Sequence, residues 1–181
     1  MAFAVSLLFN PDVAEAMFAR WTRLAAAGIS RSMLDLDYSP HVTLAVYDEL
    51  DVGAAVASLD RAFGGVDQIS VALTGFSTFG AGSGVCYVAL APSPGLISLQ
   101  ATITDVIGES CRPHYQKGHW TPHCTLAVGM ADAEMDRARD LLEPDWRFLA
   151  GMFETADLVE FAPVVSLKRW TLSIPRSTRR P

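Results

Sequence analysis

Short apolar runs alternate with longer amphipathic stretches along the first half of the chain. The short runs have the length and apolar content that are typical of strands. The longer stretches show the wider spacing of apolar positions that indicates helices, and glycine follows each of them. The expected strands are residues 3–9, 41–47 and 68–76, and the expected helices are residues 12–27 and 52–63.

The second half repeats this order when the sequence is shifted by 82 positions. Its expected strands are residues 85–91, 123–128, 154–161 and 166–174, and its expected helices are residues 94–110 and 131–142. Both halves therefore predict the order β-α-β-α-β, with one extra strand at the end of the second. The glycine-rich run at residues 79–84 is interpreted as the hinge or turn between them.

This duplication predicts an α+β fold with two lobes. A single domain over residues 1–181 would consist of two pseudo-repeat lobes, at approximately residues 1–80 and 83–175, whose sheets face each other with the helices outside. The alternative is one continuous sheet whose two halves are similar by coincidence.

Two nearly identical segments stand at equivalent positions of the repeat, SPHVTLAV at residues 39–46 and TPHCTLAV at residues 121–128. Side chains at i and i+2 of a strand point to the same face, so each segment places a histidine beside a threonine. The other face is apolar, includes Val46 and Val128, and is expected in the core. On the histidine face, Ala45 and Ala127 are expected to leave open space. The two pairs are His41 with Thr43, and His123 with Thr125.

Two histidines that face each other across the lobes suit displacement at phosphorus. A neutral imidazole takes a proton from the attacking oxygen while a protonated one gives a proton to the leaving oxygen, and histidine populates both states near neutrality. Threonine hydroxyls donate hydrogen bonds to charged phosphoryl oxygens. We therefore predict catalytic roles for His41 and His123, and phosphate binding by Thr43 and Thr125, with no metal ion or other cofactor. A duplication with a purely structural role is the alternative.

Paired H-x-T motifs on the strands of a duplicated chain resemble the 2H phosphoesterase superfamily, in its 2′–5′ RNA ligase-like and cyclic phosphodiesterase branch. The proline before each histidine and the apolar residue after each threonine also fit. The resemblance covers essentially the whole chain. It implies a bilobal fold with both motifs facing a central cleft, and action on cyclic phosphates or 2′–5′ linkages of RNA ends and nucleotides. The segment AFAVSLLFN departs from the R-x-F-[IV]-A-[IL] opening that is common among the RNA ligase-like members.

The segment before the second motif, residues 111–120, is the most basic and aromatic part of the chain. A loop of this composition beside a cleft can hold phosphate through its cations and stack a base on its aromatic rings; an ordinary solvated connection is the alternative. The cysteines and histidines around it do not match the spacing of a zinc site. The candidate substrate contacts are Tyr38, Arg112, Tyr115, Lys117 and Trp120.

Composition narrows the class of protein. Half of the 181 residues are hydrophobic, which is enough for one well-buried core. The net charge of −6 argues against a long nucleic-acid partner and favours small substrates. Three cysteines without a secretory signal argue against a disulfide framework, and no apolar stretch has the length of about 20 residues that a membrane helix needs. We expect a soluble cytoplasmic protein with no membrane or obligate protein partner.

The sequence favours a metal-independent phosphodiesterase that opens 2′,3′-cyclic phosphates of nucleotides or RNA ends by two-histidine acid–base catalysis. Reversible 2′–5′ ligation or cleavage of RNA is an alternative, because the same histidines serve both directions. A module that binds nucleotides or RNA ends without turnover is a further alternative, although all four candidate positions are intact.

Overall fold

Seven strands and five α-helices make up the described part of the chain, residues 1–80, 82–91 and 93–175 of the computed structural model. The strands are β1 (Ala2–Phe9), β2 (His41–Tyr47), β3 (Ile69–Thr78), β4 (Cys86–Leu90), β5 (His123–Ala127), β6 (Leu149–Phe161) and β7 (Val165–Thr171). The helices are α1 (Pro11–Ala26), α2 (Ser32–Asp35), α3 (Val52–Phe63), α4 (Pro94–Ile107) and α5 (Asp132–Leu142), with a 3₁₀ turn η1 at Pro113–Tyr115. The architecture is α+β, as predicted.

The strands form one antiparallel path in the order β2-β1-β6-β3-β4-β5, and β7 adds to the free side of β6. Strand β6 is long enough to serve two groups of strands. Its first residues, Leu149 to Phe153, pair with β3, whereas its later residues pair with β1 and β7. One group is therefore β2-β1-β6-β7, and the other is β5-β4-β3 with the start of β6.

The two halves of the sequence exchange their third strands. Strand β3 belongs to the first half but pairs with β4 of the second, and β6 belongs to the second half but pairs with β1 of the first. The halves at residues 1–80 and 83–175 are thus two copies of one order of elements, but neither builds a sheet by itself. Strands β3 and β4, which stand on either side of the glycine-rich run, pair with each other in one group. Of the two predicted alternatives, this pairing fits the turn and not the hinge.

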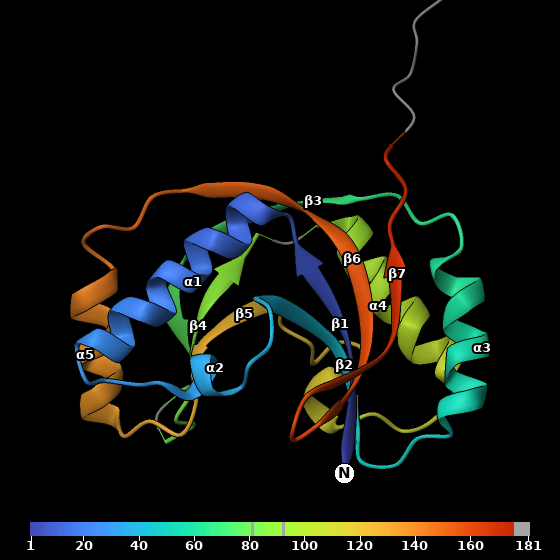
Figure 1. The fold of residues 1–181 in the computed structure, drawn as a ribbon, viewed down its shortest axis with the longest axis horizontal. Coiled ribbons are helices and arrows are strands. Elements are labelled where there is room, and N and C mark those ends of the chain that lie inside the picture. Colours follow the sequence, from blue (N-terminus) through green and yellow to red (C-terminus); the bar gives the residue numbers. More distant parts are fainter. Residues whose placement is uncertain (81, 92, 176–181) are drawn as a thin grey trace, which may run out of the picture.

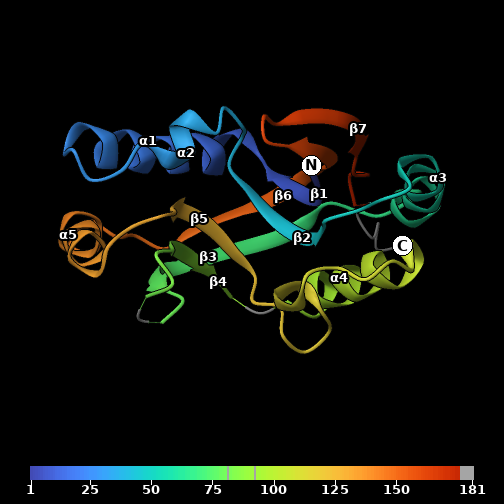
Figure 2. The same cartoon turned by 90° about the horizontal axis from the view of Figure 1, so that it is seen from below.

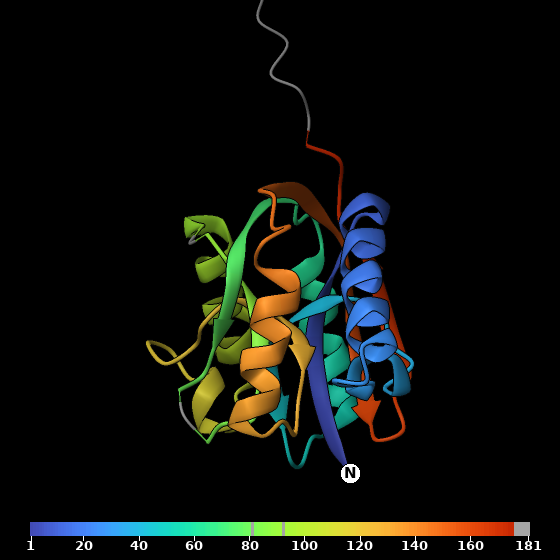
Figure 3. The ribbon, with the colours of Figure 1, turned by 90° about the vertical axis from the view of Figure 1, so that its left-hand side faces the viewer.

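The helices are shared between the halves in the same way. Helix α1 packs against α5 at one end of the molecule, and α3 packs against α4 at the other (Figures 1 and 2). Figure 3 shows α1 and α5 side by side in front of the strands. Helix α1 contacts β5, and α4 contacts β2, so each motif strand is covered by a helix from the other half of the chain.

Local sequence explains where the helices begin and how closely they pack. Pro11 stands in the first turn of α1, where its missing N–H costs nothing, and the Asp51 carboxylate accepts a hydrogen bond from the Ala54 amide at the start of α3. Gly151 of β6 lies directly under the start of α1, where a Cβ atom would collide with Val13. The main core is continuous through both groups of strands, and Trp21 is among its largest buried side chains.

Several differences separate the predicted elements from the observed ones, including the ends of α4 and β7, which lie three residues before the predicted ends at residues 110 and 174. Helix α2 and the turn η1 were not expected, and β6 begins five residues before the predicted strand at residues 154–161. The three cysteines are buried and unbonded. Within the described residues, no helix is both long and apolar enough to cross a membrane.

Candidate active site

The motif strands β2 and β5 stand at the two ends of the hydrogen-bonded path, yet they lie side by side in the middle of the molecule (Figure 1). The sheet curls until its ends approach each other, and residues of β2 lie against residues of β5. Cys124 of β5 is fully buried, on the face opposite His123. This closure brings the two H-x-T segments together.

Each histidine ring is held by the carbonyl two residues before it. Nδ1 of His41 lies 2.8 Å from the Ser39 oxygen, and Nδ1 of His123 lies 2.7 Å from the Thr121 oxygen. A carbonyl only accepts hydrogen bonds, so Nδ1 must carry a proton in both rings. Nε2 is then the atom that accepts a proton in the neutral ring and donates one in the charged ring, as acid–base catalysis requires.

A β-bulge follows the threonine in both motif strands. On β2 the extra residue is Leu44, because Ser6 pairs with Thr43 and Val5 pairs with Ala45. On β5 the extra residue is Leu126. A bulge breaks the alternation of side chains along a strand. It therefore reverses the faces after each threonine.

The bulges correct one prediction from the sequence. Ala45 and Ala127 are fully buried in the main core, whereas Val46 and Val128 line the cleft. Strict alternation had placed the alanines in the cleft and the valines in the core. The repeated Leu-Ala-Val ending therefore supplies an apolar wall beside each threonine and leaves no open space there.

A tryptophan from the opposite half of the chain holds the backbone at each bulge. The Trp120 indole N–H donates to the Thr43 carbonyl at 2.9 Å, and the Trp21 indole N–H donates to the Thr125 carbonyl at 3.0 Å. The buried Gln100 amide of α4 also donates to the Leu44 carbonyl, at 3.2 Å. These bonds satisfy carbonyls at a break in the strand pairing and fix the position of the threonines.

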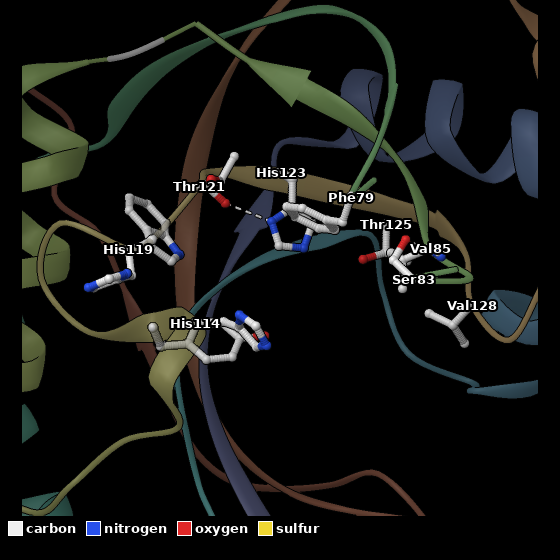
Figure 4. Close-up of a pocket in the computed structure, with 11 residues that line it drawn as sticks. Phe79, Ser83, Val85, His114, His119, Thr121, His123, Thr125 and Val128 are labelled. Atoms are coloured by element: carbon white, nitrogen blue, oxygen red, sulfur yellow. Dashed lines mark hydrogen bonds between the residues drawn. The ribbon is translucent and has the colours of Figure 1, made fainter. Parts of the chain in front are cut away.

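Two cavities meet at the motif strands. The larger, of about 540 Å³, holds His123 and Thr125, and the smaller, of about 280 Å³, holds His41 and Thr43. The residues common to both are Tyr115, Thr125 and Val128. Figure 4 shows His123 and Thr125 on the wall of the larger cavity. The site is thus a two-part cleft whose junction carries the repeated motif.

The surroundings of His41 include a buried carboxylate. Asp157 is fully buried and accepts hydrogen bonds from the Tyr38 hydroxyl at 3.2 Å and from Ser166 and Arg169, both at 2.5 Å. The Tyr38 ring packs against the His41 ring, with 4.8 Å between centroids. Loss of water and the Asp157 charge raise the pKa of Tyr38, which keeps its hydroxyl protonated as a donor.

The surroundings of His123 are aromatic. Its ring meets Phe79 edge-on with centroids 4.8 Å apart, and it meets Tyr87 at 5.2 Å. Phe79 lies at the end of the first repeat, and Phe161, at the same place in the second repeat, lines the smaller cavity with His41. Because the third strands are exchanged, each histidine therefore has a phenylalanine from the other half of the chain in its cavity.

Burial lowers the pKa of both histidines. For His41 the pKa falls to about 4, mainly because loss of water disfavours the charged ring; the Ser39 carbonyl opposes this, and the nearby His123 adds to it. The Asp157 carboxylate also acts against the shift. For His123, loss of water again lowers the pKa, and the bond to Thr121 opposes it. The rings influence each other, so their titration belongs to the pair.

The candidate substrate contacts occupy different places. Tyr38 lines the smaller cavity, Tyr115 lines both cavities, and Trp120 lines the larger one while it holds Thr43. Arg112 lines the smaller cavity, but its guanidinium bonds to Asp48 with a shortest distance of 2.5 Å. Lys117 is exposed and is not among the residues that line either cavity.

Several residues of the site were not predicted from the sequence. His114 and His119 line the larger cavity, and the buried Ser6 hydroxyl lines the smaller one without a hydrogen-bond partner among the described residues. Extending the 82-residue shift would have paired Phe79 with Phe161. Although three histidines line one cavity, the described part of the chain holds no group of three or more metal-ligating side chains close enough for an ion.

Comparisons with known proteins identify the family and the fold. Residues 11–161 match the family model of the 2′–5′ RNA ligase superfamily. The protein TT0787 of Thermus thermophilus has the same fold, with a TM-score of 0.65 and 17% identity over 97% of this chain and 100% of that chain. The comparison with curated proteins found no match.

Two further solved structures share the fold. E. coli LigT, complexed with 3′-AMP, has a TM-score of 0.65 and 18% identity over 94% of this chain and 97% of that chain. Usb1 of Kluyveromyces marxianus has a TM-score of 0.50 and 12% identity over 92% of this chain and 97% of that chain. The family match spans most of the sequence, and both of its motifs lie in one cleft. The chain therefore belongs to the 2′–5′ RNA ligase superfamily of 2H phosphoesterases.

Proposed function

We propose that this protein is a metal-independent phosphodiesterase that opens 2′,3′-cyclic phosphates of nucleotides or RNA ends. One observation carries the proposal: two histidines with protonated Nδ1 atoms and available Nε2 atoms stand in one cleft, each with a threonine two residues later on its strand. Acid–base displacement at phosphorus needs this pair of groups, in opposite protonation states.

The reaction follows from the ring nitrogens. One neutral histidine accepts a proton from water at Nε2 as the water oxygen forms a bond to phosphorus. The other, protonated histidine donates its Nε2 proton to the ribose oxygen as the bond between that oxygen and phosphorus breaks. The products are a phosphate monoester and a free ribose hydroxyl, and the two histidines have exchanged protonation states. Thr43 and Thr125 hydroxyls donate hydrogen bonds to the non-bridging oxygens, where bonds to charge are strong.

Relatives with the same fold support a small nucleotide as the substrate. E. coli LigT has been solved complexed with 3′-AMP, with phosphate, with NADP+ and with ATP. A nucleoside 3′-monophosphate is one of the two isomers that opening of a 2′,3′-cyclic phosphate produces. The proposal for this chain is thus consistent with a superfamily member that accepts nucleotides and free phosphate.

A second candidate is cleavage or formation of a 2′–5′ linkage. Cavities lie on both sides of the junction at Thr125, so a diester with a nucleoside on each side has space for both. The same two histidines would act on it, with a 5′ hydroxyl in the place of water.

The test is turnover of a panel of 2′,3′-cyclic nucleotides and 2′–5′-linked dinucleotides, with product isomers resolved by chromatography. We expect ring opening that continues in excess chelator, with His41→Ala and His123→Ala as inactive controls. Binding without turnover of any substrate would show a non-catalytic module. Activity that is lost in chelator and restored by zinc would show that a metal takes part.

A further inference from the structure

The larger cavity is unusual for so acidic a chain. The protein has 20 aspartates and glutamates against 14 lysines and arginines. None of the acidic residues is among the described residues that line this cavity, whereas three of the four histidines are: His114, His119 and His123. An acid-free pocket that gathers imidazoles can hold an anion, because a charged ring donates strong hydrogen bonds to it.

Only one of these histidines belongs to the repeated motif. Thr125 lines both cavities, so the reacting phosphate belongs at their junction, where His123 faces it. His114 and His119 come from the segment around η1, outside the motif strands, and in Figure 4 they lie on the side of the cavity away from Ser83 and Val128. Both rings are exposed, so they can turn towards a ligand.

The smaller cavity gathers fewer imidazoles. His41 is the one histidine among the described residues that line it, Met33, Leu36 and Val159 add apolar surface, and its arginine, Arg112, is already paired with Asp48. An aromatic or apolar group therefore fits the smaller cavity better, and an anionic group fits the larger one better. The two ends of the cleft therefore differ, and a substrate can bind along it in one preferred orientation.

We propose that His114 and His119 form a subsite for a second phosphate group of the substrate. The inference rests on the proposed function and specifies its substrate class: a cyclic phosphate whose nucleotide carries a further phosphate, either a terminal 5′-phosphate or the internal diester of an RNA end. The second phosphate binds in the larger cavity while the ring phosphate lies at the junction between the motif strands.

Three substrates test the subsite and separate the two sources of the phosphate. They are adenosine 2′,3′-cyclic phosphate, the same compound with a 5′-phosphate, and a dinucleotide that ends in the cyclic phosphate. We expect the wild type to prefer one or both phosphorylated substrates in kcat/KM by about tenfold, the effect of losing one hydrogen bond to a charged group. The preferred form identifies the source as terminal or internal.

The decisive variant is the double substitution His114→Gln and His119→Gln. It should reduce the preference to near unity, with most of the loss on the phosphorylated substrates. Lys117→Gln is the matched control, because it removes a full charge from the same segment outside both cavities, and it should leave the preference unchanged. Equal preference for all substrates in the wild type, or equal losses in both variants, would overturn the subsite.

A binding measurement keeps this test independent of the proposed function. If the wild type turns over none of the three substrates, the phosphodiesterase proposal fails, and calorimetry with 3′-AMP and adenosine 3′,5′-bisphosphate decides the subsite. Tighter binding of the bisphosphate that disappears in the double variant would support it. Equal affinity for both ligands would overturn it.

Discussion

The two motif strands of this protein are nearly identical in sequence, yet their surroundings differ. In both, a carbonyl two residues upstream holds Nδ1, a bulge follows the threonine, and a tryptophan from the other half holds the threonine carbonyl. The repeated phrase therefore sets the geometry of the proposed reacting groups twice, in the same way.

The residues outside the phrase make the two sides different. His41 has a tyrosine and a buried carboxylate beside it and faces the smaller cavity. His123 has two aromatic rings beside it and faces a larger cavity with further histidines. An acid–base pair must hold its two members in opposite protonation states, and two copies in identical surroundings would not distinguish them. If His41 and His123 act as the proposed pair, the difference between their neighbours distinguishes them.

Removal of either ring is the strongest way to test whether both sides take part. His41→Ala and His123→Ala should each lower kcat by roughly 10²–10⁴, the usual contribution of a general acid or base. The fall in kcat of the double variant should be much smaller than the product of the two single falls, because the pair acts as a unit. Circular dichroism should show an intact fold, since both rings line the cleft. Near wild-type turnover by either single variant would remove that histidine from the mechanism.

The pH dependence tests the protonation states of the pair. The pKa values of both histidines are lowered. The histidine that acts as base is therefore already neutral at acidic pH, and the histidine that acts as acid loses its proton at a pH below the ordinary histidine pKa of about 6.5. We therefore expect a bell-shaped profile of kcat/KM with its maximum on the acidic side of pH 6.5, and a fall of about tenfold per pH unit on the alkaline side. A flat profile from pH 5 to 9 would contradict two-histidine catalysis.

The threonines offer a smaller and more symmetrical test. Thr43→Val and Thr125→Val keep the shape of the side chain and remove its hydroxyl. If each hydroxyl bonds a charged phosphoryl oxygen, each loss should cost roughly 1.5–3 kcal/mol, or about 10- to 150-fold in kcat/KM. Steady-state kinetics on a cyclic nucleotide measures both. Unequal losses would show that one threonine bonds the phosphate more strongly than the other. Full activity in both variants would mean that the repeated phrase has a structural role only.

A change confined to one side should have the smallest effect and should separate the histidines. Asp157→Asn keeps the shape but removes the buried charge that acts against the pKa shift of His41. We expect the pKa of His41 to fall further while that of His123 stays in place, as NMR titration of the two rings would show. Ser166→Ala is the control, because it removes one donor to Asp157 and keeps the charge. Equal movement of both pKa values would mean that Asp157 acts on the site as a whole.

The sequence was sufficient for the local elements and for the convergence of the motif residues. The strand at His41–Tyr47 and the helix at Val52–Phe63 have the predicted bounds, because apolar spacing and the flanking polar or glycine residues are local signals. The four motif residues could be paired because i and i+2 share a face of a strand before the bulge. Their placement in two adjoining cavities agrees with the expected cleft.

Features that depend on partners far along the chain were not predictable. Nothing local to β3 or β6 specifies that each joins the sheet of the other half, and the early start of β6 at Leu149 reflects its pairing with β3. The bulges at Leu44 and Leu126 are set by strand register. The sequence therefore did not predict that Val46, in place of Ala45, lines the cleft. The pairing of Arg112 with Asp48 was not predictable either, because it joins residues that are far apart in the sequence.

The exchange of third strands has a consequence for how the chain folds. Strand β1, which begins at Ala2, pairs along almost its full length with β6, which ends at Phe161. When the segment with the His41 motif has been synthesised, β6 is still missing, so the sheet that contains β1 and β2 cannot form completely until nearly the whole chain has been made. Long-range pairing of this kind slows folding, because the entropy of loop closure is lost before the contacts form. The complete cleft therefore forms late, when strands from both halves have paired. A chain cut between the halves would need both pieces to assemble the cleft.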